Sequence, residues 1–154
     1  MFLYPSKSIA RRILLSFSMV TILATVGCGG VKTYPVEGKV IWPDGTPAKE
    51  LATGMVQFDL ITDKPKEQVS PHGEIQGDGS YRLSTFKLGD GVPAGKYRVA
   101  VVPHSWTEGE LGEKPRPPAV LDARFQLFES AKIEVEVKPQ RNDIPIKVER
   151  IKNR

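Results

Sequence analysis

Two histidines, His72 and His104, are the side chains of this sequence best suited to metal or acid–base chemistry. A zinc site needs three or four convergent ligands, and neither histidine has a second histidine at helical or hairpin spacing. The sequence contains no Gly-x-Ser-x-Gly motif for a serine nucleophile. A dispersed Ser–His–Asp arrangement stays open, because triads assemble across long sequence distances. We expect both histidines to be solvated loop residues, and the chain to be neither an enzyme nor a metal protein.

Two tryptophans, Trp42 and Trp106, could stack on sugar rings or anchor a partner. Trp42 ends a predicted strand before the turn Pro43-Asp44-Gly45, and we expect it to cover one end of the core. Trp106 lies in the aperiodic, proline-rich segment 103–118, which is predicted to be a loop. Two interpretations of Trp106 stay open: an exposed anchor for a protein or glycan, or a ring folded back over a sheet.

Three aspartates, Asp44, Asp78 and Asp90, each precede a glycine. Calcium prefers six to eight oxygen ligands, whereas each of these positions offers one carboxylate. Asp-Gly pairs readily occupy turns that need a positive φ, so we expect the three aspartates to make turns.

A Lys–Asn crosslink of the kind found in pilin-like domains would require Lys39 and Asn142 beside a buried carboxylate. The alternation of the first predicted strand places Glu37 and Lys39 outward. Buried Lys and Glu are rare unless paired, so we expect no crosslink.

The first 27 residues have the three parts of an export signal. Lys7, Arg11 and Arg12 form a positive segment, and the uncharged run Ile13–Val26 follows it. This run of fourteen residues is too short to span a bilayer comfortably as a helix. The pattern predicts a cleaved signal peptide over residues 1–27.

The stretch Thr25-Val26-Gly27-Cys28 resembles the lipobox of bacterial prolipoproteins, in which the cysteine is diacylated and the chain is cleaved just before it. Gly27, Cys28 and Val26 agree with that pattern, whereas Thr25 stands where leucine is usual. The resemblance implies cleavage between Gly27 and Cys28 and a covalent lipid on Cys28, with no other cofactor. The alternative is a general signal cleavage that leaves Cys28 as a spare thiol.

The charge of the mature chain is close to zero. Three of the 22 basic residues precede Cys28, so 19 remain against 18 acidic residues. Nucleic-acid binding calls for a basic patch, and none is evident in the sequence. We therefore expect no nucleic-acid partner. Residues 28–33 are predicted to be a lipidated tether, and Gly29 after the cysteine favours the outer over the inner membrane of the cell envelope.

From residue 34 onwards apolar residues alternate with polar ones, which is typical of strands with one buried face. Predicted inward stripes are Val36 and Val40; Val56, Phe58 and Leu60; Tyr81 and Leu83; Tyr97, Val99 and Val101; Ile133, Val135 and Val137; and Ile144, Ile146 and Val148. Asp78-Gly79 predicts a hairpin between 73–76 and 80–85. Phe125, Leu127 and Phe128 are expected to return the chain to the core. Short strands separated by turns predict one all-β domain over residues 34–154.

Several motifs carry a family resemblance. Tyr34-Pro-Val-Glu-Gly-Lys-Val-Ile41, Asp44-Gly-Thr-Pro47 and Gly54-Met-Val-Gln-Phe58 resemble the opening of carboxypeptidase regulatory-like domains. Asp78-Gly-Ser-Tyr-Arg-Leu83 and Pro93-Ala-Gly-Lys-Tyr-Arg-Val99 are similar to a hairpin and a strand entry that recur together in that family. The resemblance implies a transthyretin-like (Ig-like) antiparallel Greek-key β-sandwich of seven or eight strands, without catalysis.

The sequence therefore favours a membrane-anchored envelope lipoprotein whose β-sandwich is a non-catalytic structural or interaction module. Its predicted partners are the membrane, through the lipid anchor, and an envelope protein or polysaccharide. The alternative is a tethered carbohydrate-binding module that uses Trp106, with Trp42 as a second candidate contact. An enzyme or carrier with a dispersed site is the third hypothesis, because fold alone does not choose a function.

Overall fold

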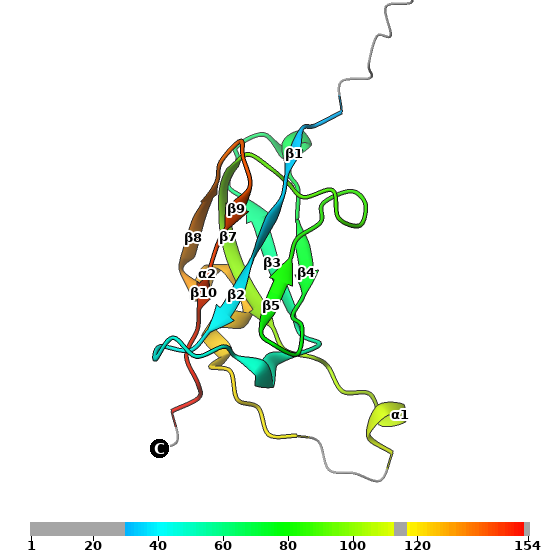
Figure 1. Cartoon of the computed structure of the whole chain (residues 1–154), viewed down its shortest axis with the longest axis vertical. Coiled ribbons are helices and arrows are strands. Elements are labelled where there is room, and N and C mark those ends of the chain that lie inside the picture. The colour runs from blue at the N-terminus through cyan, green and yellow to red at the C-terminus, as the bar shows by residue number, and fades with distance from the viewer. Residues whose placement is uncertain (1–29, 113–116, 153–154) are drawn as a thin grey trace, which may run out of the picture. The chain divides into compact units, whose positions relative to one another are not determined.

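The computed structural model describes residues 30–112 and 117–152, so the predicted signal peptide and Cys28 lie outside the described residues. Alternating apolar and polar residues form short strands in three hydrogen-bonded sheets (Figure 1). The strands are β1 (Thr33–Tyr34), β2 (Val36–Ile41), β3 (Met55–Leu60), β4 (His72–Glu74), β5 (Ser80–Arg82), β6 (Val92–Pro93), β7 (Gly95–Val102), β8 (Ile133–Val137), β9 (Asn142–Asp143) and β10 (Ile146–Lys147). The helices are α1 (Glu108–Leu111), α2 (Phe128–Ala131) and the 3-10 helices η1 (Lys49–Leu51), η2 (Pro65–Glu67) and η3 (Ala123–Gln126). The all-β prediction is confirmed.

One of the two four-stranded sheets has the order β4-β3-β7-β8, and each neighbouring pair is antiparallel. Val56 lies opposite Val101 and Phe58 lies opposite Val99, so the two predicted apolar stripes meet on one face of the sheet. Such cross-strand apolar pairs stabilise the register.

The second sheet is built around β2, which pairs with β5 in antiparallel fashion and with β9 and β10 in parallel fashion. The expectation of a wholly antiparallel domain is therefore wrong at these pairings. The C-terminal segment runs beside β2 in the same direction, with Val36 opposite Asn142 and Val40 opposite Ile146. Local alternation predicts that a segment is a strand, but it does not say which way its partner runs.

Prolines divide two of the predicted strands. Pro35 separates β1 from β2, and Pro145 separates β9 from β10. Proline has no backbone N–H to donate to a ladder. The described chain thus contains ten short strands instead of the predicted seven or eight.

The predicted hairpin at Asp78-Gly79 is confirmed, and it links the two larger sheets. β4 belongs to the sheet of β3, whereas β5 belongs to the sheet of β2. Bridges between His72 and Ser84 and between Ile75 and Tyr81 hold the two arms together. Gly79 has a φ of 80°, a conformation that glycine adopts readily.

One hydrophobic core takes side chains from both larger sheets. It includes most of the predicted inward residues, and Leu60, Ile133, Val135 and Ile144 pack against it at its edge. Phe125 joins the core as expected. The expectation for Leu127 is wrong, since its side chain is 64% exposed at the start of α2.

Gly38 allows the last segment of the chain to approach β2 closely. A Cβ atom at Gly38 would lie 2.1 Å from the backbone oxygen of Ile144. The same oxygen accepts a 2.6 Å hydrogen bond from Tyr81 Oη. Burial raises the pKa of Tyr81 well above its ordinary value, and the nearby Asp143 carboxylate raises it further. The phenol therefore stays protonated and donates this bond.

We expect Gly38→Ala to lower the free energy of unfolding by about 1 to 3 kcal/mol, because the new methyl group overpacks an interior site. Gly77→Ala is the matched control, since a Cβ at Gly77 meets nothing within 4 Å. Its effect should stay within about 0.5 kcal/mol. Urea denaturation of both variants measures the difference, and equal stabilities would contradict the close approach.

Candidate functional site

The described residues form an open groove of about 1330 Å³. Its floor carries outward side chains of β2, β4 and β5, and the loop 84–89 lines it as well. We call it the β4–β5 groove. Enclosed small-molecule pockets usually measure about 300 to 1000 Å³. The size and openness of the groove suit a segment of a polymer better than an enclosed small ligand.

Glu37 lies on the groove floor between two arginines. Arg82 on the neighbouring strand β5 places Nη2 3.4 Å from Glu37 Oε2. Arg141, which precedes β9, donates from Nε and Nη2 to Oε1, with the Nε distance at 3.1 Å. The hydrogen bond from Arg141 is the largest cause that holds the pKa of Glu37 below its ordinary value. Glu37 is therefore an ionised structural partner at neutral pH. A general acid would instead need a raised pKa.

The groove floor carries charges of both signs. Lys39 Nζ lies 3.7 Å from Asp78 Oδ2. The exposed His72 and Glu74 come from β4, and Asp143 follows from β9. Such a surface offers hydrogen-bond donors and acceptors to a polar chain without selecting strongly for one sign of charge.

Residues 84–91 are here called the 84–91 loop (the green loop on the right in Figure 1), and its residues 84–89 form a wall of the groove. At its tip Phe86 is 60% exposed and Leu88 is 99% exposed. Lys87 lies between them and is exposed as well. Large apolar side chains held in solvent are typical of a contact surface.

Asp90 holds this loop in one conformation through hydrogen bonds to its backbone. Its Oδ1 accepts a 2.8 Å hydrogen bond from the N–H of Thr85, and its Oδ2 accepts from Phe86 and Lys87 at 2.9 and 3.2 Å. Partial desolvation raises the pKa of Asp90, but the three backbone hydrogen bonds outweigh it, so the pKa is lowered. The sequence placed Asp90 correctly in a turn but did not indicate that it holds two apolar side chains outward.

The other two predicted turn aspartates behave as expected. Asp44 Oδ1 accepts hydrogen bonds from the N–H and the hydroxyl of Thr46 at 2.9 and 2.6 Å. Asp78 Oδ1 accepts from the N–H of Ser80 at 2.9 Å. Both carboxylates are used locally to shape their turns.

Trp106 is held by its neighbours in the predicted loop. Its ring is 37% exposed and packs edge-on against His104, with 4.7 Å between the ring centroids. His104 Nε2 lies 3.0 Å from Glu110 Oε1. Glu110 Oε2 accepts hydrogen bonds from the N–H and hydroxyl of Thr107 at 2.8 and 2.7 Å. His104 is thus a partner of Glu110 and Trp106, rather than the fully solvated residue expected.

Thr107 and Glu110 form a capping box at the start of α1. The first residue of such a box is Ser or Thr, and a Glu or Gln three positions later bonds back to its N–H. The sequence Thr107-Glu-Gly-Glu110 carries this signature, although segment 103–118 has no apolar periodicity. The loop around Trp106 therefore contains a short helical turn.

Trp42 is fully buried. Its Nε1 donates a 3.2 Å hydrogen bond to Glu50 Oε2, and the Arg150 guanidinium lies 4.0 Å from its ring centroid. Arg150 Nη2 also contacts Glu50 Oε1 at 2.8 Å. The expected cover over the core is present, so Trp42 offers no open face as the second ligand contact considered for it.

Lys39 and Asn142 have separate partners. The Asn142 side chain is bonded to the backbone of Lys138 and Gln140, while Lys39 faces Asp78. The structure does not bring these two side chains together as a crosslink would require.

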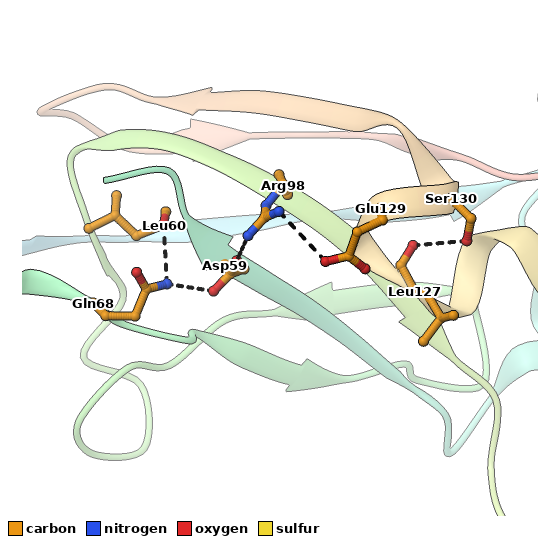
Figure 2. A network of polar contacts seen from close by, with 7 residues as sticks. All are labelled: Asp59, Leu60, Gln68, Arg98, Leu127, Glu129 and Ser130. Carbon is orange, nitrogen blue, oxygen red and sulfur yellow. Dashed lines mark hydrogen bonds and ion pairs between the residues drawn. The ribbon is translucent and has the colours of Figure 1, made fainter. Parts of the chain in front are cut away.

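A polar network outside the groove was not found from the sequence (Figure 2). Arg98 on β7 contacts Asp59 on the neighbouring β3, and its Nη1 lies 3.7 Å from Glu129 in α2. Gln68 Nε2 bonds to Asp59 Oδ1 at 2.5 Å and to the Leu60 oxygen at 3.2 Å. The network ties the loop before β4 and helix α2 to the sheet. Asp59 and Arg98 are opposite in register, so only knowledge of the strand pairing could reveal the pair.

No helix in residues 30–112 or 117–152 is both long and apolar enough to cross a bilayer. The same residues contain no group of three or more His, Cys, Asp or Glu side chains arranged to hold a metal ion. Searches against protein-family models, curated proteins and solved structures give no match to the chain. The resemblance to carboxypeptidase regulatory-like domains stays a prediction.

Acid should release Trp106 from its present setting. Hydrogen bonds from Thr107, with a smaller contribution from His104, hold the pKa of Glu110 below its ordinary value of 4.5. A lowered pKa stabilises this loop conformation above pH 4.5, and the contribution is lost as the pH falls through the lowered value. We expect Trp106 fluorescence to change below pH 4.5.

The matched variants for this titration are Glu110→Gln and Trp106→Phe. Glu110→Gln removes the titrating group and should abolish the Trp106 part of the acid transition. Trp106→Phe leaves Trp42 as the one tryptophan. Trp42 donates a hydrogen bond to Glu50, whose pKa is also lowered, so the signal of this variant is the Trp42 contribution to be subtracted. An unchanged transition in Glu110→Gln would contradict the assignment.

Proposed function

We propose that this chain is an envelope lipoprotein, anchored through a lipid on Cys28, whose β domain is a non-catalytic interaction module. The observation that carries the proposal is the β4–β5 groove, which is open and lined by charges of both signs, with Glu37, Arg82 and Lys39 held in ion pairs. Acid–base catalysis would call for a carboxyl group poised to exchange a proton. Glu37, the carboxylate held by two arginines in the groove, is instead stabilised in its ionised form.

The groove fits an extended polar partner, either a polypeptide segment or a glycan of the cell envelope. Exposed strand side chains of both signs line its floor, and the 84–91 loop borders it on one side.

For the fold we propose a Greek-key sandwich of the transthyretin-like type, as in carboxypeptidase regulatory-like domains. The order of the motifs along the sequence supports it, together with two four-stranded sheets that share one core. The parallel pairing of β9 and β10 with β2 differs from the antiparallel sandwich that the resemblance implies.

The anchor is tested by labelling cells with a radiolabelled fatty acid. The wild-type chain should incorporate label and float with the membrane fraction, more strongly with the outer than the inner membrane. Cys28→Ser should lose both label and flotation, because the sulfur that carries the lipid is gone. Label that persists in Cys28→Ser would refute lipidation at this residue.

Groove binding is tested by a photocrosslinking amino acid placed at Arg82 in intact envelopes. A second variant of the protein carries the photocrosslinking amino acid at Glu134, an exposed position of β8 outside the groove. We expect a crosslinked protein or glycan at position 82 that is absent at position 134. Crosslinks of the same species at both positions, or at neither, would remove the support for the groove.

A second candidate function is glycan binding through Trp106. It is favoured because the contact with His104 holds the ring in place while leaving it partly exposed. Such a preorganised ring can stack on a sugar. Trp106→Ala should then reduce retention on a polysaccharide array at least about tenfold, equivalent to about 1.4 kcal/mol. Leu127→Ala, which removes another exposed apolar side chain, is the control and should bind as the wild type does. A wild-type chain that binds no glycan would exclude this function.

A further inference from the structure

The tip of the 84–91 loop is an apolar wedge without cover in the described structure. Phe86 and Leu88 project into solvent, and Lys87 separates them. The loop is not free to fold these side chains back, because three backbone N–H groups on it are bonded to Asp90. Two further bonds close its base: Thr85 Oγ1 to the Gly91 oxygen at 2.6 Å, and the Gly89 N–H to Ser84 Oγ at 2.9 Å.

The loop lies beside the strand through which the chain enters the domain. Tyr34 of β1 is paired with Val92 of β6, the residue that follows the loop. Gly91 packs so closely on the Tyr34 backbone that a Cβ atom there would lie 2.2 Å from the Tyr34 oxygen. The base of the loop is therefore fixed to the start of the domain.

Chain length places a membrane within reach of this wedge. Five residue steps separate Thr33 from Cys28, which span at most about 18 Å when fully extended. Four steps separate Leu88 from Val92, at most about 14 Å. If Cys28 carries the lipid, the bilayer surface lies within the first of these distances from β1. The tip of the loop lies within the second from β6, the strand that pairs with β1. The exposed Val31 lies on the same connection.

The charges around the wedge fit an anionic lipid surface. Lys87 and Lys32 are both exposed, and Lys32 Nζ lies 5.4 Å from the centroid of the Tyr34 ring. The Asp90 carboxylate is turned into the loop, where it accepts hydrogen bonds from backbone N–H groups. Basic residues near a bilayer are attracted to anionic headgroups, and a lysine stem can lie along the apolar region while its ammonium stays in water.

We propose that Phe86 and Leu88 insert into the bilayer that holds the Cys28 lipid, with Lys87 and Lys32 contacting anionic headgroups. The proposal rests on the lipid anchor proposed above and adds a second contact to it. Insertion by side chains of this size reaches the boundary between headgroups and acyl chains. Two contacts instead of one would fix the orientation of the domain. The β4–β5 groove, which shares the loop, would then open close to the membrane surface.

A single fluorophore tests the insertion. Cys28 is the one cysteine of the sequence, and its lipid would block the sulfur. The full-length lipoprotein carrying Leu88→Cys can therefore be labelled at position 88 with an environment-sensitive dye and reconstituted into vesicles of phosphatidylcholine with phosphatidylglycerol. Lys49→Cys is the matched control, because Lys49 is exposed and begins η1. The segment that follows β2 lies at the end of the domain away from β1 (Figure 1).

We expect the dye at position 88 to shift its emission to the blue on vesicles and to lose most of its quenching by acrylamide. The dye at position 49 should show neither effect. Phe86→Asp added to Leu88→Cys should reverse both effects, since it places a charge at the inserting tip. Replacing phosphatidylglycerol with phosphatidylcholine should weaken them.

Equal acrylamide quenching at positions 88 and 49 on vesicles would overturn the insertion while leaving the anchor intact. Protection of position 88 in detergent that grows with protein concentration would assign the wedge to a second copy of the chain. Protection that requires added envelope protein would assign it to a protein partner, and either result overturns the proposal. If the Lys49→Cys chain does not float with vesicles, the anchor itself fails, and the insertion fails with it.

Discussion

The carbonyl group of Ile144 holds together parts of the chain that are more than a hundred residues apart. It lies against Gly38 of β2 and accepts the hydrogen bond of the buried Tyr81 hydroxyl on β5. A buried carbonyl without a donor would cost about 1 to 3 kcal/mol, so the tyrosine matters at this point. Because β9 and β10 flank this carbonyl, the contact also fixes Arg141 and Asp143 beside the groove floor. The ionised Glu37–Arg141 pair depends on the return of the C-terminal segment.

Much of the fold is visible in the sequence because alternation is a local property. The stripes at Val56–Leu60 and Tyr97–Val101 predict both the strands and their buried faces, and the structure confirms them. The direction of β10 beside β2 is set by long-range contacts, which alternation does not encode. Leu127 shows the same limit: the sequence predicts that it returns the chain to the core, but it lies in extended conformation just before α2 with its side chain exposed.

The candidate site was less predictable than the fold. Its charged residues come from β2, β4, β5 and β9, and each one taken alone is an ordinary surface side chain. Only the register that places Glu37 opposite Arg82 makes them one surface. The capping box at Thr107 could be seen in the sequence. Its consequence for Trp106 could not, because the contact with His104 depends on the path of the loop.

The mixture of charges on the groove restricts what can bind there. Glu37, Glu74 and Asp143 face Lys39, Arg82 and Lys87 along one floor and wall. A polyanion would gain from the basic members but would be repelled by the acidic ones, so little net steering results. A neutral polymer with many donors and acceptors meets no such opposition. Residues 28–154 agree with this, because their 19 basic and 18 acidic residues give almost no net charge and charge steering would need a strong net field. Shape complementarity and hydrogen bonding then determine which polymer the groove selects.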